Sequence, residues 1–324
     1  MEALLKIRNL SIQIEAESRL KQFLSSVEDI SFDIFPGEIL GLAGESGSGK
    51  SLSALSVVGL LGEGKKVANG SIIFRGRDML ALGEKEMQAI RGKEISFIFQ
   101  EPSSSLNPLL RIGSQITETL HIHGEKDKKL ARLRAIELLR RMKLPEPEKL
   151  MKAFPHQLSG GMCQRVMLAL AIICRPCLLI ADEPSTALDY NTQEQILSLL
   201  KEINSDYGTS ILFISHDLAV IKDLCSRVLV MYSGRILEEG NTEEIFSRPA
   251  HEYTRGLLGC IPGKAKKGEA LLSIPGRIPS LEEGRGQGCP FHPRCAKALA
   301  RCKSEFPPER EISSTHKTYC ILGK

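Results

Sequence analysis

Short apolar runs, separated by polar or glycine-rich segments, predict a sheet whose strands are mostly buried on both faces. Five runs are apolar at nearly every position: 39–43, 95–99, 178–181, 211–214 and 228–232. Such runs are typical of parallel strands that helices cover on both sides. Residues 4–35 alternate between apolar and polar positions instead, which predicts half-exposed antiparallel strands.

Helical patterns lie between these runs. We expect helices over 52–61, 162–174 and 192–203, and a helical pattern throughout 113–143. In the last segment the apolar stripe consists of Leu130, Leu133, Ile136, Leu138, Leu139 and Met142. Residues 62–70 are predicted to form a glycine-rich loop before a short strand at 71–74. Strands alternating with helices indicate an α/β fold.

One stretch between a predicted strand and a predicted helix fits the phosphate-binding pattern G-x-x-x-x-G-K-[ST]. Its residues are Gly44, Glu45, Ser46, Gly47, Ser48, Gly49, Lys50 and Ser51, and Leu52 follows in the helix. The glycines allow successive N–H groups to point inward and form an anion-binding nest at a helix N-terminus. Lys50 is then expected to reach the β- and γ-phosphates of ATP, and the Ser51 hydroxyl to bind Mg²⁺.

Polar residues follow the ends of three further predicted strands: Gln100, Asp182 and His216. Ligands of open parallel sheets bind at this edge, so these side chains are expected to face the phosphate loop. We expect Asp182, with Ser51 and Gln100, to hold Mg²⁺, and Glu183 to orient the attacking water. His216 is the candidate for contacting the γ-phosphate. Lys50, Glu183 and His216 are therefore the predicted catalytic residues.

Composition limits the protein class. The chain has 324 residues, 42% of them hydrophobic and 25% charged, which is ordinary for a globular protein of about two domains. The longest apolar run, 166–174, is far shorter than the roughly 18 residues of a membrane span. The N-terminus shows no signal-peptide pattern, so we expect a cytosolic chain. Aromatic residues make up only 5% and Trp is absent, which argues against nucleic acid as a partner.

A family resemblance rests on motifs in a fixed order. Residues 158–162, Leu-Ser-Gly-Gly-Met, resemble the signature motif of ABC-type ATPases. Gln100 is similar to their Q-loop, 182–183 to the end of their Walker B strand, 185–189 to their D-loop, and His216 to their switch histidine. Ser159, Gly160 and Gly161 precede a predicted helix and form a second candidate anion site. The resemblance implies that two subunits enclose two ATP molecules head to tail.

Further motifs resemble the dipeptide, oligopeptide and nickel importers, at 99–102, 105–108, 251–254, 274–276 and 288–291. The resemblance implies the first of two ATPase subunits, powering import of peptides, nickel or related small solutes. Its implied partners are a homologous ATPase subunit in a heterodimer, two permease subunits and an extracytoplasmic solute-binding protein, at the cytoplasmic face of the inner membrane. The alternative is a soluble ABC-type ATPase. Ile14 stands where the family has its adenine-stacking aromatic, and Phe23 is the nearest aromatic.

The predicted organisation is an ABC-type ATP-binding domain at 1–258 and a C-terminal extension at 259–324. The first domain is expected to be a P-loop NTPase core with a parallel sheet, an antiparallel β subdomain and a helical subdomain at about 101–162. The extension is basic, with twice as many Lys and Arg as Asp and Glu over 260–324.

Four of the nine cysteines lie in the last 36 residues of this extension: Cys289, Cys295, Cys302 and Cys320. Four thiols in a cytosolic chain suggest one metal site. The spacing lacks the close Cys pairs of structural zinc sites and suits a [4Fe–4S] cluster, which the resemblance also implies. Zinc is the alternative metal, and four free buried thiols are the alternative without a metal. His292 and His316 are alternative ligands. No feature of the sequence links these cysteines to Lys50 or Glu183, so we expect a structural or redox-sensing role.

Overall fold

The computed structural model describes residues 2–16, 23–100, 105–186, 188–261, 273–280, 283 and 286–323. The chain divides into two compact units. Unit 1 contains Met1–Ile34, Ile39–Leu80 and Phe213–Lys324, and unit 2 contains Phe35–Glu38 and Ala81–Leu212. Strand β8 (Ser210–Ser215) is buried along its whole length and carries the chain from unit 2 into unit 1.

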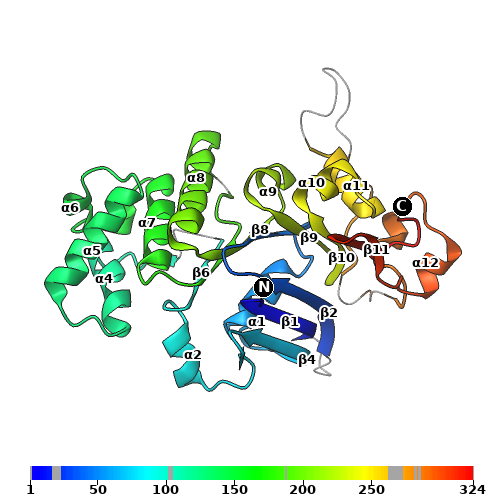
Figure 1. Ribbon diagram of the computed structural model, residues 1–324, viewed down its shortest axis with the longest axis horizontal. Helices are drawn as coiled ribbons and strands as arrows, with labels where there is room; N and C mark the ends of the chain where they lie inside the picture. The colour runs from blue at the N-terminus through cyan, green and yellow to red at the C-terminus, as the bar shows by residue number, and fades with distance from the viewer. Residues whose placement is uncertain are drawn as a thin grey trace. The chain divides into compact units, whose positions relative to one another are not determined.

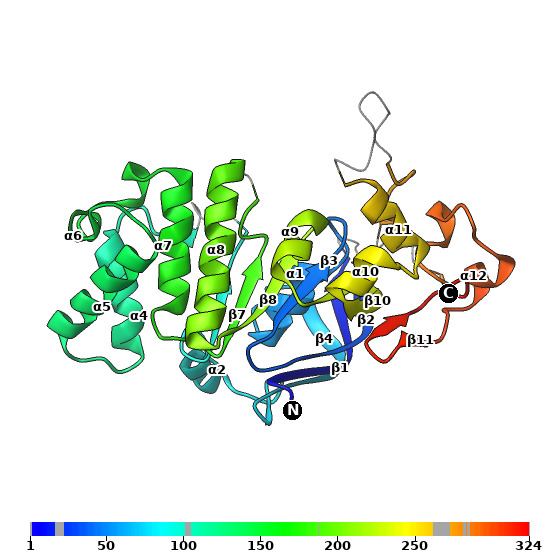
Figure 2. The ribbon, with the colours of Figure 1, turned by 45° about the horizontal axis from the view of Figure 1, so that its top comes forward.

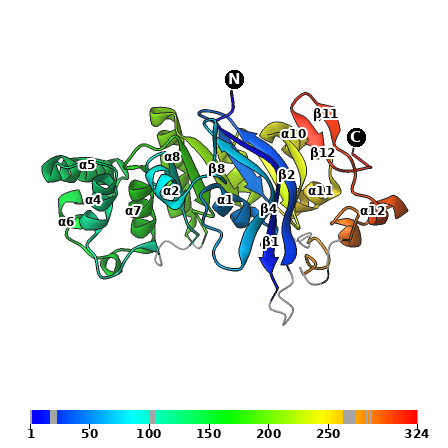
Figure 3. The same cartoon turned by 90° about the horizontal axis from the view of Figure 1, so that it is seen from below.

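Unit 1 has a four-stranded antiparallel sheet in the order β2-β1-β4-β5. Figure 3 shows β1, β2 and β4 of this sheet together. The strands are β1 (Leu5–Glu15), β2 (Phe23–Ile34), β4 (Lys65–Phe74) and β5 (Arg77–Asp78). The antiparallel strands predicted over 4–35 are confirmed by the pairing of β1 with β2.

Strand β4 is longer than expected, because its first half occupies the predicted loop. It pairs with β1 from Ile14 opposite Lys65 to Leu5 opposite Phe74. Gly70 makes this possible: its φ is 100°, and a Cβ there would lie 2.6 Å from the Arg8 carbonyl oxygen. Glycine therefore allows an irregularity in the strand that local composition suggested was a loop.

The second sheet of unit 1 has the order β11-β12-β10-β9-β3. Strands β3 and β9 are parallel, which confirms the predicted parallel pairing, and the other pairs are antiparallel. The strands are β3 (Ile39–Ala43), β9 (Arg227–Tyr232), β10 (Arg235–Asn241), β11 (Arg310–Ser313) and β12 (His316–Thr318). Every residue of β3 is buried, so this strand forms part of the core.

The helices of unit 1 are short. They are α1 (Lys50–Val57), α9 (Leu218–Leu224), α10 (Thr242–Ser247), α11 (Glu252–Gly259), α12 (Ala300–Ser304) and the 3₁₀ helix η2 (His292–Arg294). Helix α1 ends earlier than predicted. Gly59 has a φ of 63°, and Leu60 is 40% exposed rather than part of a buried helical face.

Unit 2 contains two parallel strands and most of the long helices. The strands are β6 (Ile95–Ile98) and β7 (Leu178–Asp182). The helices are α2 (Glu84–Ile90), α4 (Ile112–Ile122), α5 (Lys128–Arg141), α6 (Pro147–Leu150), α7 (Gly160–Ile172), α8 (Tyr190–Tyr207) and the 3₁₀ helix η1 (Pro155–Gln157). Helices α4 to α7 form the helical part of this unit (Figure 1), and α7 runs beside α8 (Figure 2).

The helical pattern over 113–143 consists of two helices, because Gly124 interrupts it with a φ of 103°. The predicted apolar stripe is wrong at its start. Leu133 is 64% exposed, whereas Ala131 and Ala135 are fully buried. No helix in the described ranges is both long and apolar enough to cross a membrane. The α/β fold class is confirmed, and the proposed boundary at 258 stays a prediction.

Candidate nucleotide-binding site

The phosphate loop connects β3 to α1 in unit 1, and two of its glycines are required by the fold. Gly44 has a φ of 152°, and a Cβ there would lie 2.1 Å from the Met231 carbonyl oxygen. Gly49 has a φ of 100° and precedes the first turn of α1. No other residue tolerates both the close approach and these backbone angles. The backbone is therefore fixed in the form that directs N–H groups toward an anion.

Lys50 lies beneath this loop and is 4% exposed. Its ammonium donates to the carbonyl oxygens of Gly44, at 2.7 Å, and Glu45, at 2.9 Å. Ser46 and Gly47 are exposed at the tip, while Ser51 and Leu52 are half-buried at the start of α1. The loop thus brings one buried cation and the N-terminus of a helix together, which is a site for a phosphate chain.

The acidic pair lies at the end of β7 in unit 2. Asp182 is the last residue of the strand, and Glu183 follows with a φ of 48°. Left-handed backbone angles at a non-glycine residue are rare and are found at functional sites. Glu183 Oε2 accepts hydrogen bonds from Gln100 Nε2, at 3.3 Å, and from the Thr186 hydroxyl, at 2.9 Å. The structure therefore brings Gln100 and Glu183 together, as a site for water activation requires.

Thr186 lies in the D-loop motif at 185–189, and the sequence did not predict its hydrogen bond to Glu183. A threonine three residues after a carboxylate is a common local pairing, which could have indicated it.

The signature motif lies at the N-terminus of α7 in unit 2. Ser159 caps this helix by accepting a hydrogen bond from the Met162 N–H at 3.3 Å. Ser159 and Gly160 are exposed, whereas a Cβ at Gly161 would lie 2.6 Å from Thr192. Cys163, in the first turns of this helix, is 6% exposed and packs inside the unit. The motif is an open helix N-terminus of the kind that binds anions.

The predicted site residues are divided between the units. Gly44 to Leu52 and His216 belong to unit 1, and Gln100, Asp182, Glu183 and the signature motif belong to unit 2. His216 is exposed immediately before Asp217, which caps α9. How the two groups complete one site stays a prediction.

The position expected to stack on adenine is a strand residue. Ile14 is half-buried in β1 opposite Leu24. Phe23 lies one pair further along β2 and is 37% exposed, with the Lys66 ammonium 3.8 Å from its ring centroid. Phe23 is thus the aromatic closest to Ile14 in sequence, and it lies on the neighbouring strand.

The four cysteines of the extension come together in unit 1. They line one cavity of about 20 Å³, with His251 and Phe291 among the other lining residues. Burial, together with the neighbouring thiols, raises the pKa of Cys289 to about 12. Among the described residues, no group of three or more His, Cys, Asp or Glu side chains is arranged to hold a metal ion. His316, an expected alternative ligand, does not line the cavity and instead contacts Glu238.

Comparison with known proteins decides the family. Residues 27–186 match the family model described as ABC transporter, and 237–302 match the model for the oligopeptide/dipeptide transporter C-terminal region. The oligopeptide transport ATP-binding protein OppD of Escherichia coli (strain K12) is 43% identical over 320 residues, covering 99% of this chain and 93% of that protein. The chain belongs to the family of ABC transporter ATP-binding proteins.

Two further similarities support this family. The dipeptide transport ATP-binding protein DppD of Bacillus subtilis (strain 168) is 42% identical over 323 residues, covering 99% of this chain and 95% of that protein. The solved dimer of the ATP-binding cassette MJ0796, in a post-hydrolysis state with ADP and phosphate, gives a TM-score of 0.65 at 29% identity. It covers 74% of this chain and 98% of that chain, so the ABC ATPase fold is shared.

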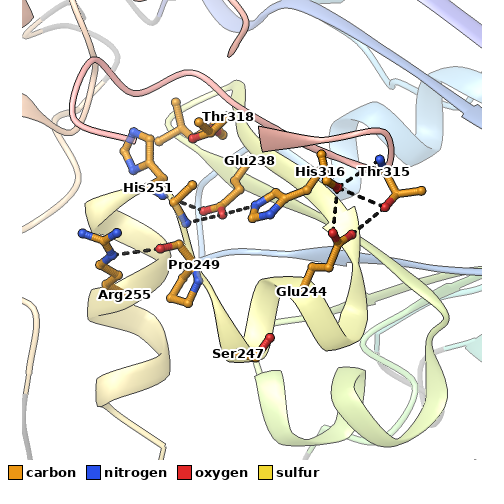
Figure 4. A network of polar contacts seen from close by, with 12 residues as sticks. Glu238, Glu244, Ser247, Pro249, His251, Arg255, Thr315, His316 and Thr318 are labelled. Atoms are coloured by element: carbon orange, nitrogen blue, oxygen red, sulfur yellow. Dashed lines mark hydrogen bonds and ion pairs between the residues drawn. The ribbon is translucent and has the colours of Figure 1, made fainter. Parts of the chain in front are cut away.

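In this ABC subunit, a buried polar network supports the segment before α11 (Figure 4). Glu238 on β10 is fully buried and accepts hydrogen bonds from the N–H groups of Ala250, at 2.6 Å, and His251, at 2.9 Å. His316 Nε2 contacts the same carboxylate at 2.7 Å. Buried carboxylates need such partners to remain in the core. The network fixes residues 250–251 and so fixes the start of α11.

His251 connects this network to the cysteines. Burial lowers the pKa of His251 to about 4, so its ring is neutral near pH 7. Its Nδ1 accepts a hydrogen bond from the Tyr253 N–H at 3.0 Å, which leaves the proton on Nε2. That nitrogen lies 3.9 Å from Cys289 Sγ. The imidazole therefore presents an N–H to one sulfur of the cluster of thiols.

Proposed function

We propose that this ABC subunit powers the import of peptides by hydrolysing ATP. The observation that carries the proposal is Glu183, held by Gln100 and Thr186 directly after the strand that ends in Asp182. Curated relatives similar along nearly the whole chain are named as peptide transport proteins, which favours a transporter over a soluble ATPase. Peptide uptake by membrane vesicles containing the complete transporter tests it: uptake should require ATP and this chain. Uptake of nickel or another solute alone would contradict the peptide assignment.

The proposed hydrolysis uses positioning and charge. Lys50 and the N–H groups of the loop bind the phosphates, and hard oxygen donors on Ser51 and Asp182, with Gln100, suit Mg²⁺. Mg²⁺, when bound, neutralises charge that develops on the phosphates. Glu183 accepts a hydrogen bond from the attacking water and orients it, while His216 contacts the γ-phosphate.

A second ATPase subunit is proposed to complete each site. The signature residues Ser159 and Gly160 are exposed at the end of a helix, so they are accessible to a nucleotide held by another chain. We propose a heterodimer with a homologous subunit, attached to two permeases at the cytoplasmic face of the inner membrane and supplied by an extracytoplasmic solute-binding protein. ATPase activity should then depend on both ATPase chains. Full activity of this chain as a monomer would contradict it.

The turn after Gln100 is the proposed contact with a permease. Leu109 is 83% exposed at its tip, although the turn itself is held firmly. The buried Gln115 side chain accepts from the Asn107 N–H at 2.9 Å and donates to the carbonyl oxygens of Asn107 and Leu110, both at 3.0 Å. Residues 101–104, which begin this segment, lie outside the described residues. A rigid turn with an exposed leucine is suited to docking on an apolar partner surface.

A charged substitution tests this contact. Leu109→Asp should reduce peptide uptake strongly and leave ATP hydrolysis by the isolated ATPase subunits unchanged. Leu133→Asp on α5 is the matched control, because Leu133 is also exposed, at 64%. Uptake at the wild-type rate in Leu109→Asp would contradict docking at this turn.

For the four cysteines we propose a [4Fe–4S] cluster, with one zinc ion as the alternative. The support is that all four thiols line one cavity and that burial disfavours the thiolates of Cys289 and Cys295, an effect that a bound cation would reverse. Cys289, Cys295, Cys302 and Cys320 would be the ligands. Protein purified without oxygen should be brown and contain about four iron atoms per chain. One zinc per chain would favour the alternative, and protein free of metal would refute both.

A further inference from the structure

The C-terminal extension contacts the phosphate loop through one buried arginine. Arg294 ends η2 and is followed directly by Cys295. Its guanidinium binds the Glu45 carboxylate with both arms, Nη1 to Oε2 at 2.7 Å and Nη2 to Oε1 at 3.2 Å. The Arg294 side chain is only 6% exposed. Forked pairs of this kind are among the strongest and most directional contacts that side chains make.

The remaining donors of Arg294 are also used. They reach the carbonyl oxygens of Pro275, at 2.8 Å, and Ile274, at 3.3 Å, and the Tyr232 hydroxyl, at 3.3 Å. These contacts hold the guanidinium in position independently of its contact with Glu45. This arrangement differs from an exposed ion pair, which contributes little because its side chains lose freedom when they pair.

A second contact holds the backbone of the same loop residue. The Glu45 N–H donates to the Tyr253 hydroxyl at 3.0 Å. Tyr253 is fully buried, and its ring packs against Tyr232, at 4.6 Å between centroids, and Phe291, at 5.2 Å. Phe291 and Arg294 lie on the segment between Cys289 and Cys295. One packed cluster therefore connects the cysteine segment to Glu45.

Glu45 is adjacent to the groups that bind phosphate. Its carbonyl oxygen accepts from Lys50 Nζ at 2.9 Å and from the Ser48 N–H at 3.2 Å. A displacement of Glu45 would therefore move the lysine and the turn that directs the N–H groups of the loop. Binding is strongest when such groups are held in position before the ligand arrives.

We propose that Arg294, with Tyr253, is a positioning residue of the nucleotide site, so that the C-terminal extension forms part of the ATP-binding machinery. The inference rests on ATP binding at the phosphate loop. It predicts that loss of Arg294 weakens ATP binding through the displacement of Glu45.

The test is a titration of the full-length chain, without Mg²⁺, with a fluorescent N-methylanthraniloyl derivative of ATP. Arg294→Ala should raise the Kd about tenfold, and should raise KM for ATP while leaving kcat close to wild type. Arg301→Ala is the matched control, because Arg301 is an exposed arginine of the same extension that pairs with Glu305. Its Kd should equal that of the wild type.

A double-mutant cycle tests whether Arg294 acts through Glu45, and a conservative variant guards against a loss of folding. Glu45→Gln should also raise the Kd, and the double variant should bind no more weakly than Arg294→Ala alone, because both changes remove one contact. Independent, multiplying effects would overturn the inference, as would a wild-type Kd in a folded Arg294→Ala protein. If that variant does not fold, Arg294→Lys decides: a raised Kd supports the inference and an unchanged Kd overturns it. Failure of the wild type to bind the probe would count against ATP binding itself.

Discussion

Removal of the Thr186 hydroxyl should slow ATP hydrolysis without weakening ATP binding. Thr186→Val keeps the shape of the side chain but deletes the donor that lies 2.9 Å from Glu183 Oε2. A second hydrogen bond to that oxygen, from Gln100 Nε2, is longer at 3.3 Å. Glu183 also has an unfavourable φ of 48°, a backbone strain of the kind found at functional sites.

The size of the effect follows from the charge on Glu183. A hydrogen bond to a charged group contributes about 1.5–3 kcal/mol, and each 1.4 kcal/mol in the barrier changes a rate about tenfold. Thr186 is only half-buried, so water can replace part of the lost bond. We therefore expect kcat to fall about tenfold, at the lower end of this range.

Steady-state phosphate release by the assembled ATPase subunits measures this effect, with nucleotide affinity determined separately. Thr186→Ser retains the hydroxyl and should restore kcat. Thr117→Val is the matched control, because the Thr117 hydroxyl donates to the Gly113 carbonyl within α4. A wild-type kcat in Thr186→Val would refute the view that Thr186 holds Glu183.

Two further predictions concern backbone and core. Gly44→Ala should abolish ATP binding and lower the melting temperature, because the new Cβ would lie 2.1 Å from the Met231 carbonyl oxygen. Nucleotide titration measures the binding and calorimetry measures the melting temperature. Normal ATP binding would contradict the assigned loop geometry. Glu238→Gln should lower the free energy of unfolding by about 3 kcal/mol, because it replaces a buried carboxylate, which accepts hydrogen bonds, with an amide whose NH₂ group faces donors. An unchanged denaturant midpoint would contradict this role of Glu238 in stability.

The sequence predicted the elements whose signals are local. The buried strands and the phosphate loop could be recognised because apolar runs and fixed glycine spacings are contained in a few residues. The extent of β4 could not, since its first half is specified by pairing with β1 rather than by its own composition. The contact between Arg294 and Glu45 joins residues 249 positions apart, so no periodicity or spacing in the sequence predicts it.

The wrong prediction of which positions on α5 are buried has a similar cause, because it too depends on contacts that are distant in sequence. Leu133 fits an apolar stripe by spacing, yet Ala131 and Ala135 face the core, because tertiary packing decides which face of α5 is buried. The four cysteines line one cavity, and the metal site expected there stays a prediction. Their proximity to the residues that support the phosphate loop was not expected. His251 and Phe291, which link the two, lie in the motifs at 251–254 and 288–291, but those motifs do not indicate which residues they contact.

The central claim, that Glu183 orients the water that attacks ATP, is tested most directly by Glu183→Gln in the assembled ATPase subunits. Nucleotide affinity and phosphate release are measured on the same preparation. The account predicts ATP binding with the wild-type Kd and a fall in kcat of about 10²-fold or more, since a positioned general base contributes about 10²–10⁴-fold. Wild-type turnover by this variant would contradict the account.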